Sequence, residues 1–262
     1  MGKHLRILLQ FWRASLIQAM EYRTSFFLSM LANTIDFTVG LAQYALFFTV
    51  AETVAGWEMP QLLAFYGVFM TVFSLHFIFL YPNLAAISRL VNTGTLDLVL
   101  VKPVSAQVLL SFRELSFEEV GSFLAAQALL AGLWATGRIA PGPAEFAGFL
   151  LALLISLTLI HALFLFLLGL AVWFEKLENT SDLLWTIFGL CRYPTDVFPR
   201  RWRWVFTAVV PIAFVATTPA AILCRGPSLD SLGLGLAMAS LFGLMARAFW
   251  RWALRGYTSA GG

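Results

Sequence analysis

The stretch FAGFLLALLISLTLIHALFLFLLGLAVWF, residues 146–174, contains no charged side chain and lies between Glu145 and Glu175. A helix needs about 20 apolar residues to cross the hydrocarbon core of a bilayer, so this run is long enough to span a membrane. The whole chain is 60% hydrophobic and 12% charged, and this charged fraction is about half that of ordinary soluble domains. We therefore expect an all-α membrane protein in which lipid covers the apolar surface.

Other apolar runs on both sides of this stretch complete a pattern of six transmembrane helices. We expect spans at about 24–51, 60–81, 116–137, 146–174, 177–193 and 228–250. The run over 205–224 is also long enough, but Pro211 and Pro219 each remove a backbone donor. We predict a pair of outer re-entrant helices over 195–225, and a kinked seventh span is the alternative.

The positions of the basic residues predict the orientation of the chain. Lys and Arg favour cytosolic loops, and six spans with a cytosolic N-terminus place most of the 17 Lys and Arg on the inner side. Both termini are then cytosolic.

Residues 1–23 form a separate interface segment, and residues 24–262 form a single transmembrane domain. In the first segment, apolar residues recur at helical spacing, namely Leu5, Leu8, Leu9, Trp12 and Leu16. This spacing predicts an amphipathic helix on the inner membrane surface, or alternatively a polar extension of the first span.

Small and polar residues line one face of the first span, at positions Ser29, Asn33, Asp36, Gly40 and Gln43. Such a seam drives helix association in lipid, so it predicts packing against a neighbouring helix or a second subunit. An intramembrane carboxylate is costly and needs partners or water. Asn33, Asp36 and Gln43 are therefore candidates for a translocation path or a subunit interface.

The remaining reactive side chains do not form an enzyme motif. His76 and His161 are isolated, and we interpret them as satisfied core histidines rather than metal ligands or proton relays. Ser116–Glu119 has the pattern of a capping box that opens the third span. Cys191 and Cys224 are interpreted as buried free thiols, with a disulfide as the alternative. We find no catalytic residue, no metal site and no GxxxxGK[ST] nucleotide motif, so we expect no enzyme activity and no cofactor on this chain. The net charge of +3 is small and does not indicate nucleic-acid binding.

A short insert, NTGTLDLVLVKPVSAQ over residues 92–107, separates the second and third spans. We expect a helix over 83–91, a stop at Asn92–Gly94, and a further helix from Ser105 towards Arg113. Exposed leucines in a folded cytosolic piece favour a protein partner. The alternative is a tight loop that packs on its own bundle.

Three segments carry a family resemblance: TGTLDLVLVKP at 93–103, RYPTDVFPRRWRW at 192–204 and VVPIAFVATTPAAIL at 209–223. They resemble the membrane subunit of ABC-2 type transporters, in particular a bacterial group whose permease genes commonly come in pairs beside an ATPase gene. The resemblance implies a multi-pass protein of the bacterial inner membrane with six spans per subunit. It also implies a second permease, identical or paralogous, and two separate cytosolic ATPase subunits that bind ATP and Mg.

The resemblance also suggests roles for individual residues. Segment 82–113 would hold a coupling helix that docks on the ATPase, through Arg89, Asn92, Gly94, Leu96, Asp97, Lys102 and Pro103. The outer re-entrant region would include Arg192, Tyr193, Pro194, Pro199, Pro211 and Pro219. The basic residues Arg200, Arg201 and Arg203 depart from the family pattern and leave the substrate open between lipids, amphiphilic drugs and anionic glycans.

The leading hypothesis is therefore the permease subunit of an ATP-driven exporter, with ATPase subunits, a second permease and membrane lipids as its partners. One alternative is a membrane-embedded, lipid-modifying enzyme that uses Asp36, His76 or His161. Another is a membrane anchor for an ATPase that transports nothing.

Overall fold

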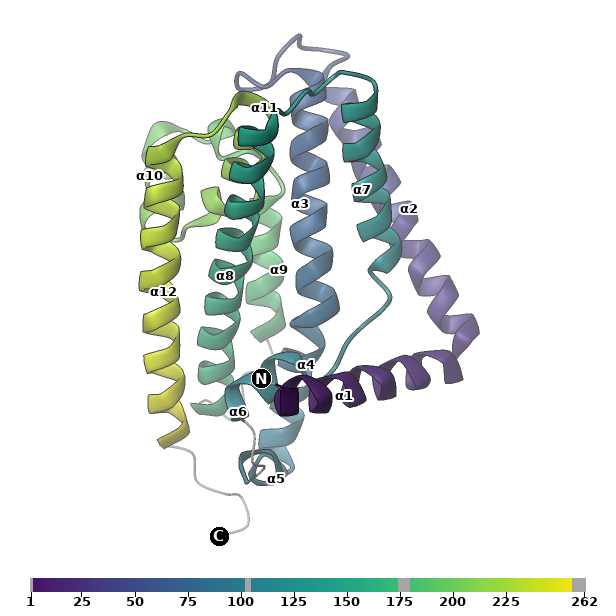
Figure 1. Cartoon of the computed structure of the whole chain (residues 1–262), viewed down its shortest axis with the longest axis vertical. Coiled ribbons are helices and arrows are strands. Elements are labelled where there is room, and N and C mark those ends of the chain that lie inside the picture. The colour runs from purple at the N-terminus through teal and green to yellow at the C-terminus, as the bar shows by residue number, and fades with distance from the viewer. Residues whose placement is uncertain (1, 102–104, 174–179, 256–262) are drawn as a thin grey trace.

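The computed structural model describes residues 2–101, 105–173 and 180–255, and these residues form an upright helical bundle (Figure 1). The helices in chain order are α1 (Gly2–Glu21), α2 (Arg23–Phe47), α3 (Met59–Phe79), α4 (Tyr81–Asn92), α5 (Asp97–Leu100), α6 (Ala106–Phe112), α7 (Val120–Ala135), α8 (Pro143–Trp173), α9 (Thr180–Cys191), η1 (Thr195–Val197), α10 (Arg200–Ala208), η2 (Ile212–Phe214), α11 (Thr217–Arg225) and α12 (Leu229–Arg255). Apart from one isolated bridge between Val54 and Trp57, the described residues contain no β-structure. The all-α prediction is confirmed.

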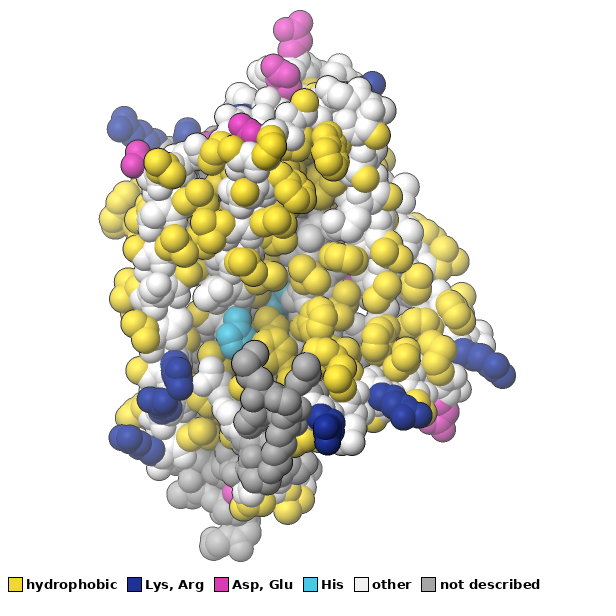
Figure 2. All heavy atoms as spheres, viewed as in Figure 1, with side chains coloured by type: hydrophobic (Ala, Val, Ile, Leu, Met, Phe, Trp, Pro, Cys, Tyr) yellow, Lys and Arg dark blue, Asp and Glu magenta, His cyan; other side chains and the backbone are white. Residues whose placement is uncertain are grey.

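Four helical stretches are long and apolar enough to cross a membrane: Arg23–Phe47, Met59–Asn83, Pro143–Leu170 and Leu229–Arg255. They match four of the six predicted spans. The other two predicted spans correspond to α7, with 16 residues, and to α9, with 12 residues in the described part of the chain. Figure 2 shows hydrophobic side chains over the middle height of the molecule and most charged side chains towards its two ends. This surface is that of a membrane-embedded protein.

The two ends of the bundle differ in structure. α1 lies across the lower end in Figure 1, beside α4, α5 and α6, and α12 also ends there at Arg255. We call this the insert end, and the opposite end, with α10 and α11, the far end. α1 is not an extension of the first span, because the chain leaves helical geometry at Tyr22, with φ of −107° and ψ of 47°.

The third span begins differently from the prediction. α7 is capped by Glu119, without a side-chain capping hydrogen bond, and Ser116 lies outside the helix. The predicted capping box is therefore wrong. Its residues are used in tertiary contacts instead: the Ser116 amide donates to the Ile78 carbonyl at 3.0 Å, and the Asn33 amide side chain donates to the Glu118 carbonyl at 3.2 Å.

The proline-rich segment over 195–225 contains two short helices, α10 and α11, each of 9 residues. A helix of that length covers only about 14 Å, so neither crosses a membrane. The chain breaks between them around Pro211, which directly precedes η2, whereas Pro219 lies in the first turn of α11, where its missing N–H costs little. The described residues of this segment therefore contain no single helix of span length.

The core of the bundle lies around α3 and α8. α3 is buried along most of its length, and α8 packs closely along α12 because Gly169 lies against the Phe249 ring. α2 differs, because most of its apolar side chains are exposed, among them Leu28, Leu31 and Val39. The exposed face of α2 is therefore covered by lipid or by another subunit.

Candidate functional site

The described residues of the insert between α3 and α7, which are 82–101 and 105–113, form three short helices with buried side chains among them. α4 ends at Asn92, and Gly94 has a φ of +66°, a left-handed conformation that glycine adopts without strain. The predicted helix stop at Asn92–Gly94 is confirmed. The chain then turns back, since the Leu96 amide donates to the Leu90 carbonyl at 3.1 Å.

The tip of the insert presents two exposed apolar side chains. Leu98 is 65% exposed and Val101 is 78% exposed, whereas Leu96 and Val99 are buried below them. Each pair is three residues apart, the spacing that puts two side chains on one face of a helical turn. The inward face holds the insert together, and the outward face offers an apolar contact to a partner.

The residues predicted to contact an ATPase are distributed unevenly over this unit. Leu96 belongs to the buried face, while Gly94 and Asp97 are partly exposed near the tip. Arg89 and Asn92 lie on α4, with side chains outside the described part of the structure. Lys102 and Pro103 lie outside the described residues altogether. Leu98 and Val101 were not predicted as contacts, because the sequence alone does not show which side chains the helical turn of α5 directs outwards and which it buries.

Asn83 ties the beginning of the insert to its end. Its side-chain amide donates to the Glu114 carbonyl at 2.9 Å, and its side-chain oxygen accepts from the Glu114 amide at 2.8 Å. The same amide also donates to the Phe79 carbonyl at 2.9 Å. A buried asparagine that satisfies both backbone groups of another residue fixes the position of that residue.

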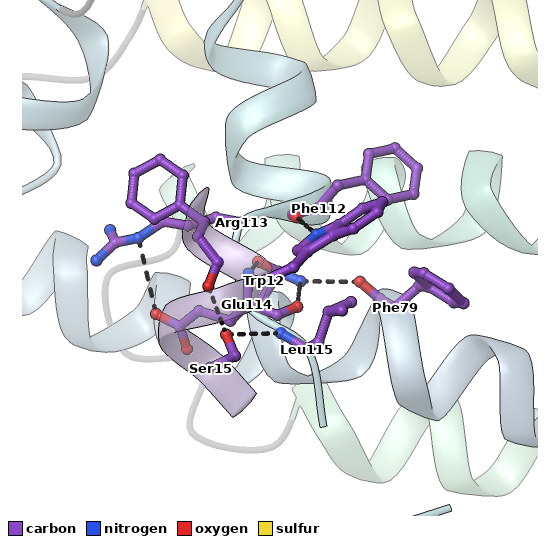
Figure 3. A network of polar contacts seen from close by, with 9 residues as sticks. Trp12, Ser15, Phe79, Phe112, Arg113, Glu114 and Leu115 are labelled. Atoms are coloured by element: carbon purple, nitrogen blue, oxygen red, sulfur yellow. Dashed lines mark hydrogen bonds and ion pairs between the residues drawn. The ribbon is translucent and has the colours of Figure 1, made fainter. Parts of the chain in front are cut away.

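α1 also contacts the chain segment at residues 112–115, next to the Asn83 contacts (Figure 3). The Trp12 indole N–H donates to the Phe112 carbonyl at 2.8 Å, and the Leu115 amide donates to the Ser15 hydroxyl at 3.3 Å. The Trp12 ring also packs edge-on against Phe79, with centroids 6.0 Å apart. We call this group the clasp: Trp12, Ser15 and Asn83 with the backbone of residues 112–115.

A polar pocket lies higher in the bundle, between α2, α3, α7 and the end of α9. It has a volume of about 250 Å³, and three charged side chains face it: Asp36, Glu119 and Arg192. Asn33, Tyr66 and Ser122 supply further polar groups among its lining residues. Charged side chains at this depth are costly in lipid and are typical of substrate or ion paths.

The contacts around the pocket hold Arg192 and leave Asp36 open. Arg192 donates to the Gln43 side chain at 3.2 Å, and its carbonyl accepts from the Tyr44 hydroxyl. Asp36 is exposed and has no hydrogen-bond or ion-pair partner among the described residues. The structure thus brings Asn33 and Asp36 to one pocket, with Gln43 bonded to the arginine at its edge. Glu119, which was predicted to belong to a helix cap, also lines this pocket.

The small residues of the predicted seam on α2 allow close packing within this chain. Gly40 faces the Tyr66 hydroxyl, which donates to the Phe37 carbonyl at 2.9 Å, and any Cβ at position 40 would overlap that hydroxyl. Part of the seam therefore packs against α3, whereas Asp36 and Gln43, at the polar pocket and its edge, stay exposed.

The residues predicted for the outer region lie at several levels of the far end. Arg192 faces the polar pocket, and Tyr193 stacks on Tyr44 with centroids 6.3 Å apart. Pro194 is buried, and Pro199 directly precedes α10.

The histidines and cysteines have no catalytic arrangement in the described chain. Cys191 and Cys224 are free thiols. His76 is buried as predicted, but the prediction that it is satisfied is wrong, since neither ring nitrogen has a hydrogen-bond partner among the described residues. Aromatic rings surround it instead, with Phe188 4.8 Å away between centroids. The described residues also contain no group of three or more His, Cys, Asp or Glu side chains placed to hold a metal ion.

Comparison with known proteins places the chain in a family. Neither the curated proteins nor the solved structures gave a match. The model of the ABC-2 family transporter protein matches residues 24–261, which is most of the chain. The chain belongs to the ABC-2 family of transporter proteins, as the permease component of an ABC transporter.

Proposed function

We propose that this chain is the permease subunit of an ABC exporter whose separate ATPase subunits dock on the insert, residues 82–113. The single observation that carries the proposal is the exposed apolar pair Leu98 and Val101 at the tip of a unit whose base is fixed by Asn83. Because the base of the insert is fixed, a partner that binds the apolar tip can displace the insert as a unit. In this proposal the insert end is cytosolic, in a bacterial inner membrane.

The polar pocket supports a transport role for the same chain. Asp36 is exposed on a helix whose other exposed residues are mostly apolar. An exposed carboxylate inside a membrane span needs water or another chain beside it. We propose that a second permease, identical or paralogous, faces α2 and closes a path lined by Asp36, Glu119 and Arg192.

The re-entrant arrangement of α10 and α11 belongs to the same proposal. Both helices are too short to span, and both lie at the far end of the bundle (Figure 1). We propose that they dip into the outer leaflet and close the path on that side. The proposed complex has six spans in each permease, with α7 and α9 as its two shorter members, and ATP and Mg bound by the ATPase subunits.

The rival functions have less support. A lipid-modifying enzyme would need Asp36 and a histidine at one site, but His76 and His161 are not among the residues that line the pocket of Asp36. A membrane anchor that transports nothing would not need a charged pocket inside its span.

Docking is tested by co-expressing the tagged chain with a candidate partner ATPase and measuring how much ATPase co-purifies. Burying a leucine side chain contributes about 1.5–3 kcal/mol, so Leu98→Ser is expected to weaken the complex about tenfold or more. Leu229 is 84% exposed at the far end, and Leu229→Ser is the matched control. Equal recovery of the ATPase by the two variants would contradict docking on the insert. ATP turnover by the complex in liposomes, with and without candidate substrates, then separates a transporter from an anchor.

A further inference from the structure

An apolar cavity of about 370 Å³ lies between α8, α9, η2 and α12. Its inner wall consists of buried residues, including Leu159, Ala162 and Ala246. Its rim is exposed, and Val209 and Met245 lie there with their side chains open to the surface. The cavity therefore opens sideways on the face of the bundle, where the surroundings are lipid.

The rim of this cavity continues directly from α10. Val209 and Pro211 line the cavity and follow the last residue of α10, and the Val209 amide is still bonded to the Val205 carbonyl at 2.9 Å. α10 lies at the far end of the bundle (Figure 1) and exposes two tryptophans, Trp202 and Trp204. Exposed tryptophans beside basic residues are typical of the level of the lipid headgroups.

Two of the three arginines of α10 are available to a ligand. Arg203 pairs with Asp196 at 3.7 Å and donates to the Phe198 carbonyl at 2.9 Å, so it holds α10 to the preceding turn. Arg200 and Arg201 are exposed and have no hydrogen-bond or ion-pair partner within the described part of the chain. α10 is about 14 Å long, so these two guanidinium groups lie roughly one helix length from the cavity rim.

We propose that α10 and this cavity together bind one anionic phospholipid from the far-end leaflet. One acyl chain fills the apolar cavity, and the phosphate lies against Arg200 and Arg201. The two parts of the site are separated by about the length of α10. In a phospholipid, a similar distance separates the phosphate from the deeper part of the acyl chain. Two positive charges with no partner select an anionic headgroup over a zwitterionic one.

The test is native mass spectrometry of the purified permease alone, titrated with dioleoyl phosphatidylglycerol, dioleoyl phosphatidylcholine or glycerophosphoglycerol. A basic side chain near an anionic headgroup contributes about 1 kcal/mol, or about fivefold in affinity. We expect phosphatidylglycerol to bind at least about tenfold more tightly than phosphatidylcholine. The double variant Arg200→Gln/Arg201→Gln is expected to lose about 25-fold for phosphatidylglycerol only. Arg138→Gln, another exposed arginine of the far end, is expected to change neither affinity.

The cavity is tested by filling it. Ala246→Leu places a larger side chain in the inner wall on α12, whereas Ala248→Leu makes the same change at an exposed position of the same helix. The first is expected to weaken binding of both lipids, and the second to leave it unchanged. Ala162→Leu fills the cavity from α8 and replaces Ala246→Leu if that variant does not fold.

Equal affinity for the two lipids, or a preference for phosphatidylglycerol that persists in the double arginine variant, would overturn the proposed headgroup site. Unchanged lipid affinity in the cavity-filling variants, or equal affinity for glycerophosphoglycerol and phosphatidylglycerol, would overturn the proposed acyl-chain site. The titration needs no ATPase, so its failure leaves the proposed docking on the insert untouched.

Discussion

Replacing Asn83 by alanine removes the side chain that satisfies both backbone groups of Glu114. The wild-type side chain accepts from the Glu114 amide at 2.8 Å and donates to its carbonyl at 2.9 Å, and it is itself buried. Each buried polar group that loses its partner costs about 1–3 kcal/mol. Glu114 is half-buried, so water replaces part of these bonds. We therefore expect the local opening free energy of this segment to fall by about 2–3 kcal/mol.

Hydrogen–deuterium exchange of the protein in lipid nanodiscs measures this loss directly. A decrease of 2 kcal/mol corresponds to exchange about 30-fold faster in peptides that cover residues 112–117. Asn33→Ala is the matched control, because the Asn33 side chain is less buried and makes one hydrogen bond, to the Glu118 carbonyl at 3.2 Å. It is expected to raise exchange by about 2- to 13-fold, less than the roughly 30-fold of Asn83→Ala, since a single such bond contributes about 0.5–1.5 kcal/mol. Equal exchange in wild type and Asn83→Ala would refute the role of Asn83 as the tie of the insert.

Four further substitutions test the insert, the packing of α2 and the pocket. Gly94→Val forces a β-branched residue into a φ of +66°, at a cost of about 1–2 kcal/mol. We expect it, like Asp97→Asn, to lower substrate-stimulated ATP hydrolysis while membrane insertion, measured by fractionation, stays normal. Gly40→Ala is expected to lower the melting temperature by several degrees, because its Cβ overlaps the Tyr66 hydroxyl and such overpacking costs about 1–3 kcal/mol. Asp36→Asn keeps the shape of the side chain and removes its charge, so we expect reduced transport in liposomes with an unchanged or higher melting temperature.

The apolar runs of the sequence predicted the membrane class and, among six expected spans, the four long helices, because length and the absence of charge are properties of the chain itself. The helical spacing of apolar residues near the N-terminus predicted the separate helix α1. The start of the third span could not be predicted in this way. Ser116 and Glu119 fit the local pattern of a capping box. In the structure, residues 114–118 instead form hydrogen bonds with Asn83, Ile78 and Asn33. Tertiary bonds of this kind leave no periodic signal in the sequence.

The candidate site, too, could be predicted from the sequence only in part. The position of the insert and the exposure of some of its leucines followed from the sequence, and so did the polar seam on α2. That Asp36, Glu119 and Arg192 line one pocket did not follow, because these residues are distant in the chain and their helices meet only in the folded bundle. For His76, the sequence-based prediction went too far. Its burial was predicted, but the assumption that a buried histidine finds a partner was wrong for this one.

The clasp and the polar pocket are joined by one short piece of chain. Glu114 is held by Asn83, Ser116 is bonded to α3, the Glu118 carbonyl accepts from Asn33, and Glu119 faces the pocket. Five residue steps of extended chain cover at most about 18 Å, and this piece is non-helical until Glu119 caps α7. Hydrogen bonds at Glu114, Ser116 and Glu118 therefore hold this piece between the insert and Glu119. For a displacement of the insert to drive transport, the bonds along this piece must differ between two states, since a partner shifts an equilibrium only through contacts that differ between them. Asn83 and Asn33 are the side chains that make those bonds at its two ends, so their substitution probes the connection between ATPase docking and the path.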